Sequence, residues 1–224
     1  ARDVLEATRA PHQIDGQAVL VGGSIGIALS EDAGGDADRI MKQADLALYA
    51  AKSETRGGVC LFEAKMEAGL IERQQLRADL RLGLERGEFE LVYQPILELK
   101  TERVSSFEAL LRWRHPRLGM VSPAGFIDLA EESGLIVPIG EWVLKTACAE
   151  AAKWPEQVSV AVNLSTRQFA DSALSETIEQ ALGGLSPSRL EVEITESVLL
   201  KDSRANLLTL RRLRDLGIRI ALDD

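Results

Sequence analysis

The sequence has little cysteine, no long apolar run and no excess of positive charge. Its two cysteines, Cys60 and Cys148, lie far apart and belong to no CxxC pair. They predict reduced thiols in a cytosolic setting and argue against a disulfide framework or a cysteine zinc site. No apolar run is long enough to cross a bilayer, and no charged-then-apolar leader opens the chain. We expect this piece to be soluble and cytoplasmic, with any membrane tether of the parent protein lying upstream.

The net charge of the 224 residues is −9. This balance argues against a binder of nucleic-acid polymers, because such a protein needs a basic surface that neutralises phosphates. A small phosphorylated ligand remains compatible with it, provided that a few local cations or metal ions hold the phosphates. Hydrophobic residues make up 46% of the chain and charged residues 27%, as in ordinary globular proteins. The length allows one large domain or two modest ones.

The first 66 residues predict a small α/β segment. Asp15-Gly16 supplies the positive φ angles that a two-residue hairpin loop needs. Apolar residues recur at spacings of three and four after Asp38, which predicts an amphipathic helix capped by that residue. The expected elements are the end of a helix over residues 1–10, a strand over 18–29, a helix over 38–52 and a strand over 59–62.

Residues 63–86 are an almost unbroken helix-forming stretch, with Leu76, Leu80 and Leu84 on one stripe. We interpret this stretch as the helix that connects two domains, with the boundary near residues 66–72. The leucine stripe must pack against another element, because an apolar stripe is stable only when it is buried. The predicted organisation is therefore an N-terminal domain over 1–66, a connecting helix over 67–86 and a second domain over 87–224.

Strands alternate with helices after Gly87, which predicts a parallel sheet with helices packed outside it. Gly217 stands where a glycine commonly ends a helix. The expected strands are residues 91–99, 104–113, 158–165, 190–197 and 218–224, and the expected helices are 123–133, 138–154, 171–182 and 203–216.

These strands have one apolar face and one polar face. An antiparallel sheet with a wet side gives the same alternation, but the intervening helices favour a parallel sheet whose polar face lines an enclosed space, as in a barrel. Asn163, Glu193 and Asp223 then lie near the carboxyl ends of their strands, where barrel enzymes keep their active sites. Glu108, with Arg112 on the same parity, does so on the strand over 104–113.

Glu108, Asn163, Glu193 and Asp223 all offer oxygen atoms, which suit a hard divalent cation such as magnesium, manganese or calcium. The adjacent pair Asp223-Asp224 can serve two ions at once, as two-metal phosphoester hydrolysis requires. Scattered surface carboxylates are the alternative interpretation. The pattern by itself is compatible with a metal site and with scattered surface carboxylates, and it does not decide between them.

The same residues resemble the EAL domain family, which is named for a Glu-Ala-Leu signature, here Glu108-Ala109-Leu110. That tripeptide alone means little, but further motifs follow in the family's order and cover residues 73–224. They are Leu91-Val92-Tyr93-Gln94-Pro95-Ile96, Phe107–Trp113, His115-Pro116, Gly119, Pro123, Phe126-Ile127, Ala130-Glu131, Gly134-Leu135-Ile136, Gly140-Glu141-Trp142, Val162-Asn163-Leu164-Ser165, Glu193-Ile194-Thr195-Glu196 and Asp223-Asp224.

This resemblance implies a modified (β/α)8 barrel that hydrolyses cyclic di-GMP to the linear dinucleotide pGpG with Mg²⁺ or Mn²⁺. Calcium is expected to inhibit. The resemblance also implies roles for the residues of these motifs. The implied metal ligands are Glu108, Asn163, Glu193, Asp223 and Asp224, and the implied substrate contacts are Gln94 and Arg112. The implied catalytic residues are Glu108, Asp223, Asp224 and Glu196, of which Glu196 orders the loop after the paired aspartates. His115, Trp113 and Trp142 are predicted to be packing residues.

The first segment resembles the end of a GGDEF domain, on the motifs Ser24–Ala28 and Ala44–Lys52. Lys52 and Arg56 match residues that contact nucleotide phosphates in that family, although Thr55 replaces its usual glycine. The GGDEF signature itself is absent from these residues, so we expect no cyclase activity from this segment.

The resemblance covers about three-fifths of an EAL domain, and the family's catalytic lysine and further glutamates belong to its later strands. We therefore expect the 224-residue piece to be inactive by itself and to associate, with a homodimer as the expected form of the protein. An alternative to the enzyme is a degenerate EAL module that binds cyclic di-GMP as a receptor or a regulatory scaffold.

Overall fold

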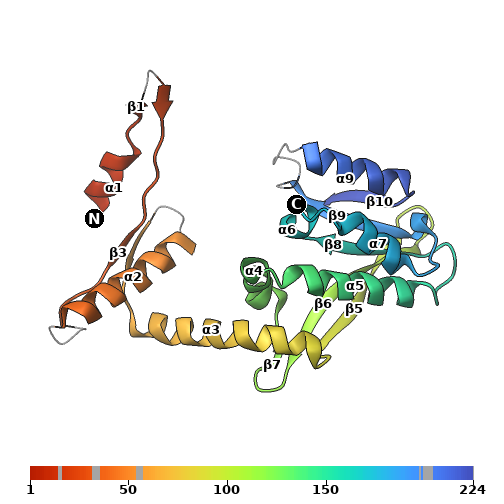
Figure 1. The fold of residues 1–224 in the computed structure, drawn as a ribbon, viewed down its shortest axis with the longest axis horizontal. Coiled ribbons are helices and arrows are strands. Elements are labelled where there is room, and N and C mark those ends of the chain that lie inside the picture. Colours follow the sequence, from red (N-terminus) through yellow and green to blue (C-terminus); the bar gives the residue numbers. More distant parts are fainter. Residues whose placement is uncertain (15–16, 32–35, 54–57, 197, 199–203, 224) are drawn as a thin grey trace. The chain divides into compact units, whose positions relative to one another are not determined.

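The computed structural model describes the chain except residues 15–16, 32–35, 54–57, 197, 199–203 and 224 (Figure 1). It divides into two compact units, Ala1–Gln75 and Leu76–Asp224. The division falls inside helix α3 (Ala64–Glu85), which is the long helix predicted over residues 63–86. No described helix is long and apolar enough to span a bilayer.

The described part of the first unit holds short strands, helices α1 and α2, and the first part of α3. Its elements are α1 (Arg2–Arg9), β1 (His12–Ile14), β2 (Gln17–Val19), β3 (Ile25–Ile27), α2 (Ala37–Ser53) and β4 (Val59–Leu61). β1 and β2 form the predicted hairpin, with Ile14 opposite Gln17, although Asp15-Gly16 lies outside the described residues. β3 pairs with β4 in parallel, and a side chain at Gly26 would meet the backbone of α2 at 2.2 Å.

One prediction for this unit is wrong. The single strand expected over residues 18–29 is two strands, β2 and β3, separated by residues 20–24 that are not in a strand. The break contains Gly22-Gly23, and glycine weakens a strand because it loses much backbone freedom and offers no side chain to pack.

The second unit is a sheet covered by helices on one face. Its strands are β5 (Phe89–Glu98), β6 (Arg103–His115), β7 (Gly119–Val121), β8 (Ser159–Leu164), β9 (Leu190–Thr195) and β10 (Arg219–Asp223), in the order β10-β9-β8-β6-β5 with β7 on β6. β6, β8, β9 and β10 run in parallel, as predicted, whereas β5 and β7 pair with β6 in antiparallel.

The described helices between these strands are α4 (Pro123–Ser133), α5 (Ile136–Ala151), α6 (Thr166–Phe169), α7 (Leu174–Leu182), the 3₁₀ turn η1 (Pro187–Arg189) and α9 (Arg204–Asp215). Four of them, α4, α5, α7 and α9, follow the predicted helices, with shifts at the ends of the last three, whereas the short α6 and η1 were not predicted. Helix α5 begins two residues before the expected Pro138, because proline is tolerated in the first turn of a helix. Gly217 has a φ of 88° just beyond α9, in the role that the sequence predicts.

The core lies between the sheet and helices α5 and α7, which run along one face of it (Figure 1). The apolar parity of β8 and β9 is buried there, as expected from the alternation. Trp113 is fully buried and its ring stacks on Phe89 at a centroid distance of 5.6 Å. The opposite parity therefore presents its polar side chains on the other face of the sheet.

Candidate functional site

The polar face of the sheet brings the predicted site residues onto neighbouring strands. Gln94 on β5 lies opposite Glu108 on β6, and Asn163 on β8 lies opposite Glu193 on β9. On β10, Ala221 is opposite Glu193, so Asp223, two residues later, belongs to the same face. The register thus places all five residues on one face. Asn163, Glu193 and Asp223 are near the carboxyl ends of their strands, whereas Glu108 is in the middle of β6 and not near its carboxyl end, where the sequence predicts it.

Glu108 and Asn163 are in direct contact. The Nδ2 atom of Asn163 donates a hydrogen bond of 2.8 Å to Oε1 of Glu108. This bond leaves the amide oxygen of Asn163 and the second carboxylate oxygen of Glu108 available as acceptors. Since Asn163 is exposed and Glu108 half-buried, both oxygens can be reached by a ligand.

The other predicted ligands are placed to different degrees. Glu193 is half-buried and is the register partner of Asn163, whereas Glu196 is exposed one residue beyond the end of β9. The backbone of Asp223 pairs with Thr195, and Asp224 lies outside the described residues. Across the described residues, no group of three His, Cys, Asp or Glu side chains is close enough together to hold a metal ion.

The donor types nevertheless fit a hard divalent cation. Carboxylate and amide oxygens are the ligands that Mg²⁺ and Mn²⁺ prefer. Glu108 and Asn163 supply such oxygens from two different strands, at a spacing that a hydrogen bond already defines. The described part of the face therefore offers two oxygen donors of the kind that such a cation prefers.

A cleft of about 330 Å³ lies at the same end of the strands. Its polar lining comes from Arg112, Glu131, Asn163, Ser165, Gln168 and Thr195. Its apolar walls come from β6, from the end of β8 and from helices α4 and α5. Nη1 of Arg112 donates a hydrogen bond of 2.9 Å to the carbonyl oxygen of Leu111, so the guanidinium keeps further donors. An arginine beside apolar walls suits a ligand that has both a phosphate and an aromatic base. Gln94 is exposed opposite Glu108 and is not part of this lining.

The loop after Asn163 is fixed by a contact that the sequence analysis missed. Ser165 and Gln168 form a capping box at the start of α6, and Gln168 is buried against Gly140 of α5. A side-chain carbon at Gly140 would lie 1.8 Å from Nε2 of Gln168. The Ser-x-x-Gln spacing of residues 165–168 was the signal that could have predicted this short helix.

A second missed feature lies nearer the amino ends of the strands. Nε of Arg219 on β10 is 3.3 Å from Oε2 of Glu191 on β9, and its Nη2 donates to Oγ of Ser159 on β8. Arg219 therefore joins three strands on the polar face and offsets one of its carboxylates. The sequence signal that could have predicted this contact is the position of Arg219 among the alternating polar residues of the strand over 218–224.

Within the part of the chain that the structure describes, Cys148 and Tyr93 have shifted pKa values, and both lie on the helix-covered side of the sheet. Burial raises the pKa of the Cys148 thiol to about 11. Burial, followed by the nearby Glu150 carboxylate and Cys148, raises the pKa of Tyr93 to about 12. Both groups are therefore neutral at physiological pH, and neither belongs to the candidate site.

The residues predicted to serve packing do so. His115 is buried beside a turn, Trp113 is fully buried and Trp142 is half-buried against the core. In the first unit, Lys52 is exposed near the end of α2, and Arg56 lies outside the described residues.

The family model described as "EAL domain" matches residues 77–224, and the model described as "Diguanylate cyclase, GGDEF domain" matches residues 1–58. Among curated proteins, the chain is 41% identical to the bifunctional diguanylate cyclase/cyclic di-GMP phosphodiesterase MucR of Pseudomonas aeruginosa. It is 38% identical to the cyclic di-GMP phosphodiesterase PdeR of Escherichia coli. Each alignment covers 100% of this chain and 34% of the relative.

An uncharacterised protein of Sinorhizobium fredii is 46% identical over 100% of this chain and 27% of its own length. The chain therefore spans about a quarter to a third of the curated relatives that it matches. Among solved structures, the Pseudomonas aeruginosa MucR phosphodiesterase in complex with c-di-GMP has a TM-score of 0.63 at 42% identity, covering 67% of this chain and 63% of that one. The EAL enzyme Bd1971 with cAMP and cyclic di-GMP bound has a TM-score of 0.63 at 30% identity, covering 70% and 45%.

Proposed function

This chain belongs to the EAL domain family over residues 77–224, and from that premise we propose that it is part of a metal-dependent phosphodiesterase that hydrolyses cyclic di-GMP to linear pGpG. The observation that carries the proposal is the contact between Glu108 and Asn163, which brings two oxygen ligands together from different strands. Relatives named as cyclic di-GMP phosphodiesterases support the choice of substrate.

In this proposal, Glu108, Asn163, Glu193 and Asp223 hold one Mg²⁺ or Mn²⁺ ion, and Asp223 and Asp224 engage a second. When bound, the ions supply Lewis-acid polarisation of the phosphodiester and a water of lowered pKa. The hydrogen bond from Asn163 fixes one Glu108 oxygen, so that the other oxygen points to a defined position. This preorganisation of ligands before the metal enters is the contribution of the protein.

The cleft beside these ligands is the proposed binding place for the nucleotide. Arg112 lines it and offers forked donors to a phosphate oxygen, while its apolar walls suit a guanine face. Gln94, opposite Glu108, is the second proposed substrate contact. Glu196, just beyond β9, is proposed to order the loop that follows Asp224.

Three finer statements belong to the same proposal. Residues 1–66 make no cyclic di-GMP, because Lys52 and Arg56 stand there without a GGDEF hairpin. The 224-residue piece is inactive alone. It also associates, since β10 is an edge strand of the described sheet and Leu222 on it is exposed. We further propose that the protein acts in the cytoplasm as a homodimer.

The test is turnover of cyclic di-GMP by the full-length protein with Mg²⁺ or Mn²⁺, followed by chromatography of pGpG. Glu108→Ala should abolish turnover, and Glu179→Ala, an exposed glutamate on α7, is the matched control that should leave it unchanged. A wild-type protein that binds cyclic di-GMP without cleaving it would instead identify a receptor. Turnover that survives Glu108→Ala would refute the assigned metal site.

A further inference from the structure

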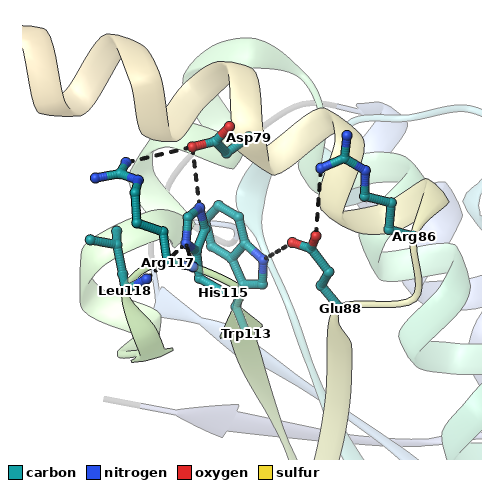
Figure 2. Close-up of polar contacts among 7 residues, drawn as sticks. All are labelled: Asp79, Arg86, Glu88, Trp113, His115, Arg117 and Leu118. Carbon is teal, nitrogen blue, oxygen red and sulfur yellow. Dashed lines mark hydrogen bonds and ion pairs between the residues drawn. The ribbon is translucent and has the colours of Figure 1, made fainter.

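Helix α3 and strand β6 meet at a buried polar contact (Figure 2). The imidazole of His115, at the end of β6, is 3% exposed, and its Nε2 lies 3.2 Å from Oδ2 of Asp79 on α3. Arg117 approaches the same carboxylate oxygen at 3.8 Å. Asp79 and His115 are 36 residues apart in sequence, and the contact joins two elements that strand β5 separates along the chain.

The hydrogen bonds of the ring assign a single neutral tautomer. The backbone N–H groups of Arg117 and Leu118 both donate to Nδ1 of His115, at 3.1 Å each. Nδ1 therefore acts as the acceptor, which leaves the ring proton on Nε2, where it points at Asp79. One side of the ring holds the turn between β6 and β7, and the other side holds α3.

A second contact fixes the turn between α3 and β5 against the same strand. Nε1 of Trp113 donates a hydrogen bond of 3.0 Å to Oε2 of Glu88, which follows α3, and Arg86 lies 3.9 Å from the other carboxylate oxygen (Figure 2). A side-chain carbon at Gly83 would lie 2.9 Å from that indole nitrogen. Helix α3 thus packs so closely on β6 that position 83 has no room for a residue larger than glycine.

Strand β6 carries the candidate site on its opposite parity. Trp113 and His115 face the helices, whereas Glu108 and Arg112 belong to the polar face. His115 also pairs with Gly119 of β7, and β7 leads directly into α4, whose Pro123 lines the cleft. A shift of α3 would therefore reach Glu108, the proposed metal ligand, Arg112, the proposed phosphate contact, and one wall of the cleft.

We propose that Asp79 and His115 are positioning residues that couple helix α3 to the candidate site, so that the placement of α3 sets the rate of hydrolysis. The proposal rests on the proposed function. Its regulatory meaning follows from the course of α3, because residues 64–75 of the helix belong to the first unit and residues 76–85 to the second. A conformational change that reaches the first part of the helix would change the position of Asp79.

The test compares His115→Gln with His115→Asn in the full-length protein. Glutamine places an N–H where Nε2 stands and can keep the contact with Asp79, whereas asparagine places its amide at the Nδ1 position and keeps only the turn. We expect His115→Asn and Asp79→Ala each to lower kcat by about ten- to a hundred-fold, since misplaced catalytic groups cost that much. His115→Gln should stay within about three-fold of the wild type, and the double variant Asp79→Ala/His115→Asn should be no slower than either single variant.

Wild-type rates in folded Asp79→Ala and His115→Asn would overturn the proposal, as would a loss in His115→Gln as large as that in His115→Asn. If Asp79→Ala does not fold, Asp79→Asn replaces it, with a smaller loss expected and a wild-type rate counting against coupling.

A measurement that does not depend on catalytic activity distinguishes this proposal from the proposed function. Amide hydrogen exchange over residues 104–115 should rise in Asp79→Ala and stay unchanged in Glu72→Ala, an exposed glutamate on the same helix. Unchanged exchange in Asp79→Ala would refute the coupling, whereas a wild type without turnover would refute the proposed function alone.

Discussion

Asn163 and Glu108, 55 residues apart in sequence, are joined by a hydrogen bond of 2.8 Å between the carboxyl end of β8 and the middle of the parallel strand β6. The bond is exposed, so its own contribution to the free energy of unfolding is small, about 1 kcal/mol. Its consequence is positional, because it holds two oxygen ligands at a fixed spacing on a face that also carries Glu193 and Asp223.

Asn163→Asp is expected to make folding depend on metal. The change places a second carboxylate within hydrogen-bonding distance of Glu108, and like charges at that distance raise one of the two pKa values and destabilise the fold without a counter-ion. The full-length variant should melt at a lower temperature than the wild type in chelator, and added Mg²⁺ should recover most of the loss. Asn163→Ala is the control, since it removes the amide without adding charge. A melting temperature of Asn163→Asp that does not respond to metal would contradict a cation site at this position.

Gly140→Ala is expected to destabilise the second unit by about 1–3 kcal/mol, which is the usual cost of overpacking. The added carbon would overlap Gln168 and disrupt its capping box with Ser165, directly after Asn163. Gly69→Ala on α3 is the matched control, because nothing lies within 4 Å of that position, and the alanine should stabilise the helix by about 1 kcal/mol. Denaturant unfolding measures both, and equal effects at the two glycines would show that Gln168 is not fixed there.

Stability is expected to fall as the pH rises from about 9 to 11, in part because of Cys148. Its folded-state pKa is raised to about 11, so the unfolded chain loses the thiol proton first. The folded state then binds more protons in this window, and the free energy of unfolding decreases with pH. Cys148→Ala should reduce the slope, whereas Cys60→Ala in the first unit controls for removal of a thiol. An unchanged slope in Cys148→Ala would show that this thiol is not the group responsible.

Calcium should compete with magnesium without supporting hydrolysis. Both ions prefer oxygen ligands, but Ca²⁺ is larger and less demanding of octahedral geometry. In the full-length protein, we expect turnover of cyclic di-GMP to fall as Ca²⁺ is added at constant Mg²⁺ and to recover when Mg²⁺ is raised. Loss of activity that excess Mg²⁺ cannot reverse would indicate a calcium site elsewhere.

The 224-residue piece is expected to associate when it is made alone. Strand β10 forms one edge of the described sheet, and edge strands offer backbone donors and acceptors to other chains. Light scattering should show species larger than a monomer, and a phosphodiesterase assay should show no turnover. A stable, active monomer would contradict both statements.

Much of the second unit could be predicted because its signals are local. Alternation with a period of two placed Glu108, Asn163, Glu193 and Asp223 on one parity of their strands, and any sheet built from those strands keeps them on one face. The order of strands and helices then predicted a parallel sheet, and Gly217 predicted the end of α9. The sequence erred over residues 18–29, where a pair of glycines interrupts the alternating pattern.

The sequence by itself thus determined which residues share a face and where the elements run, because both depend on neighbours within a few positions. Only the tertiary structure decided that Asn163 donates to Glu108, that Gln168 fills the space beside Gly140, and that His115 reaches Asp79. Each of these contacts joins residues 28 to 55 positions apart. They depend on strand order and on how closely a helix packs, and no local period in the sequence encodes either.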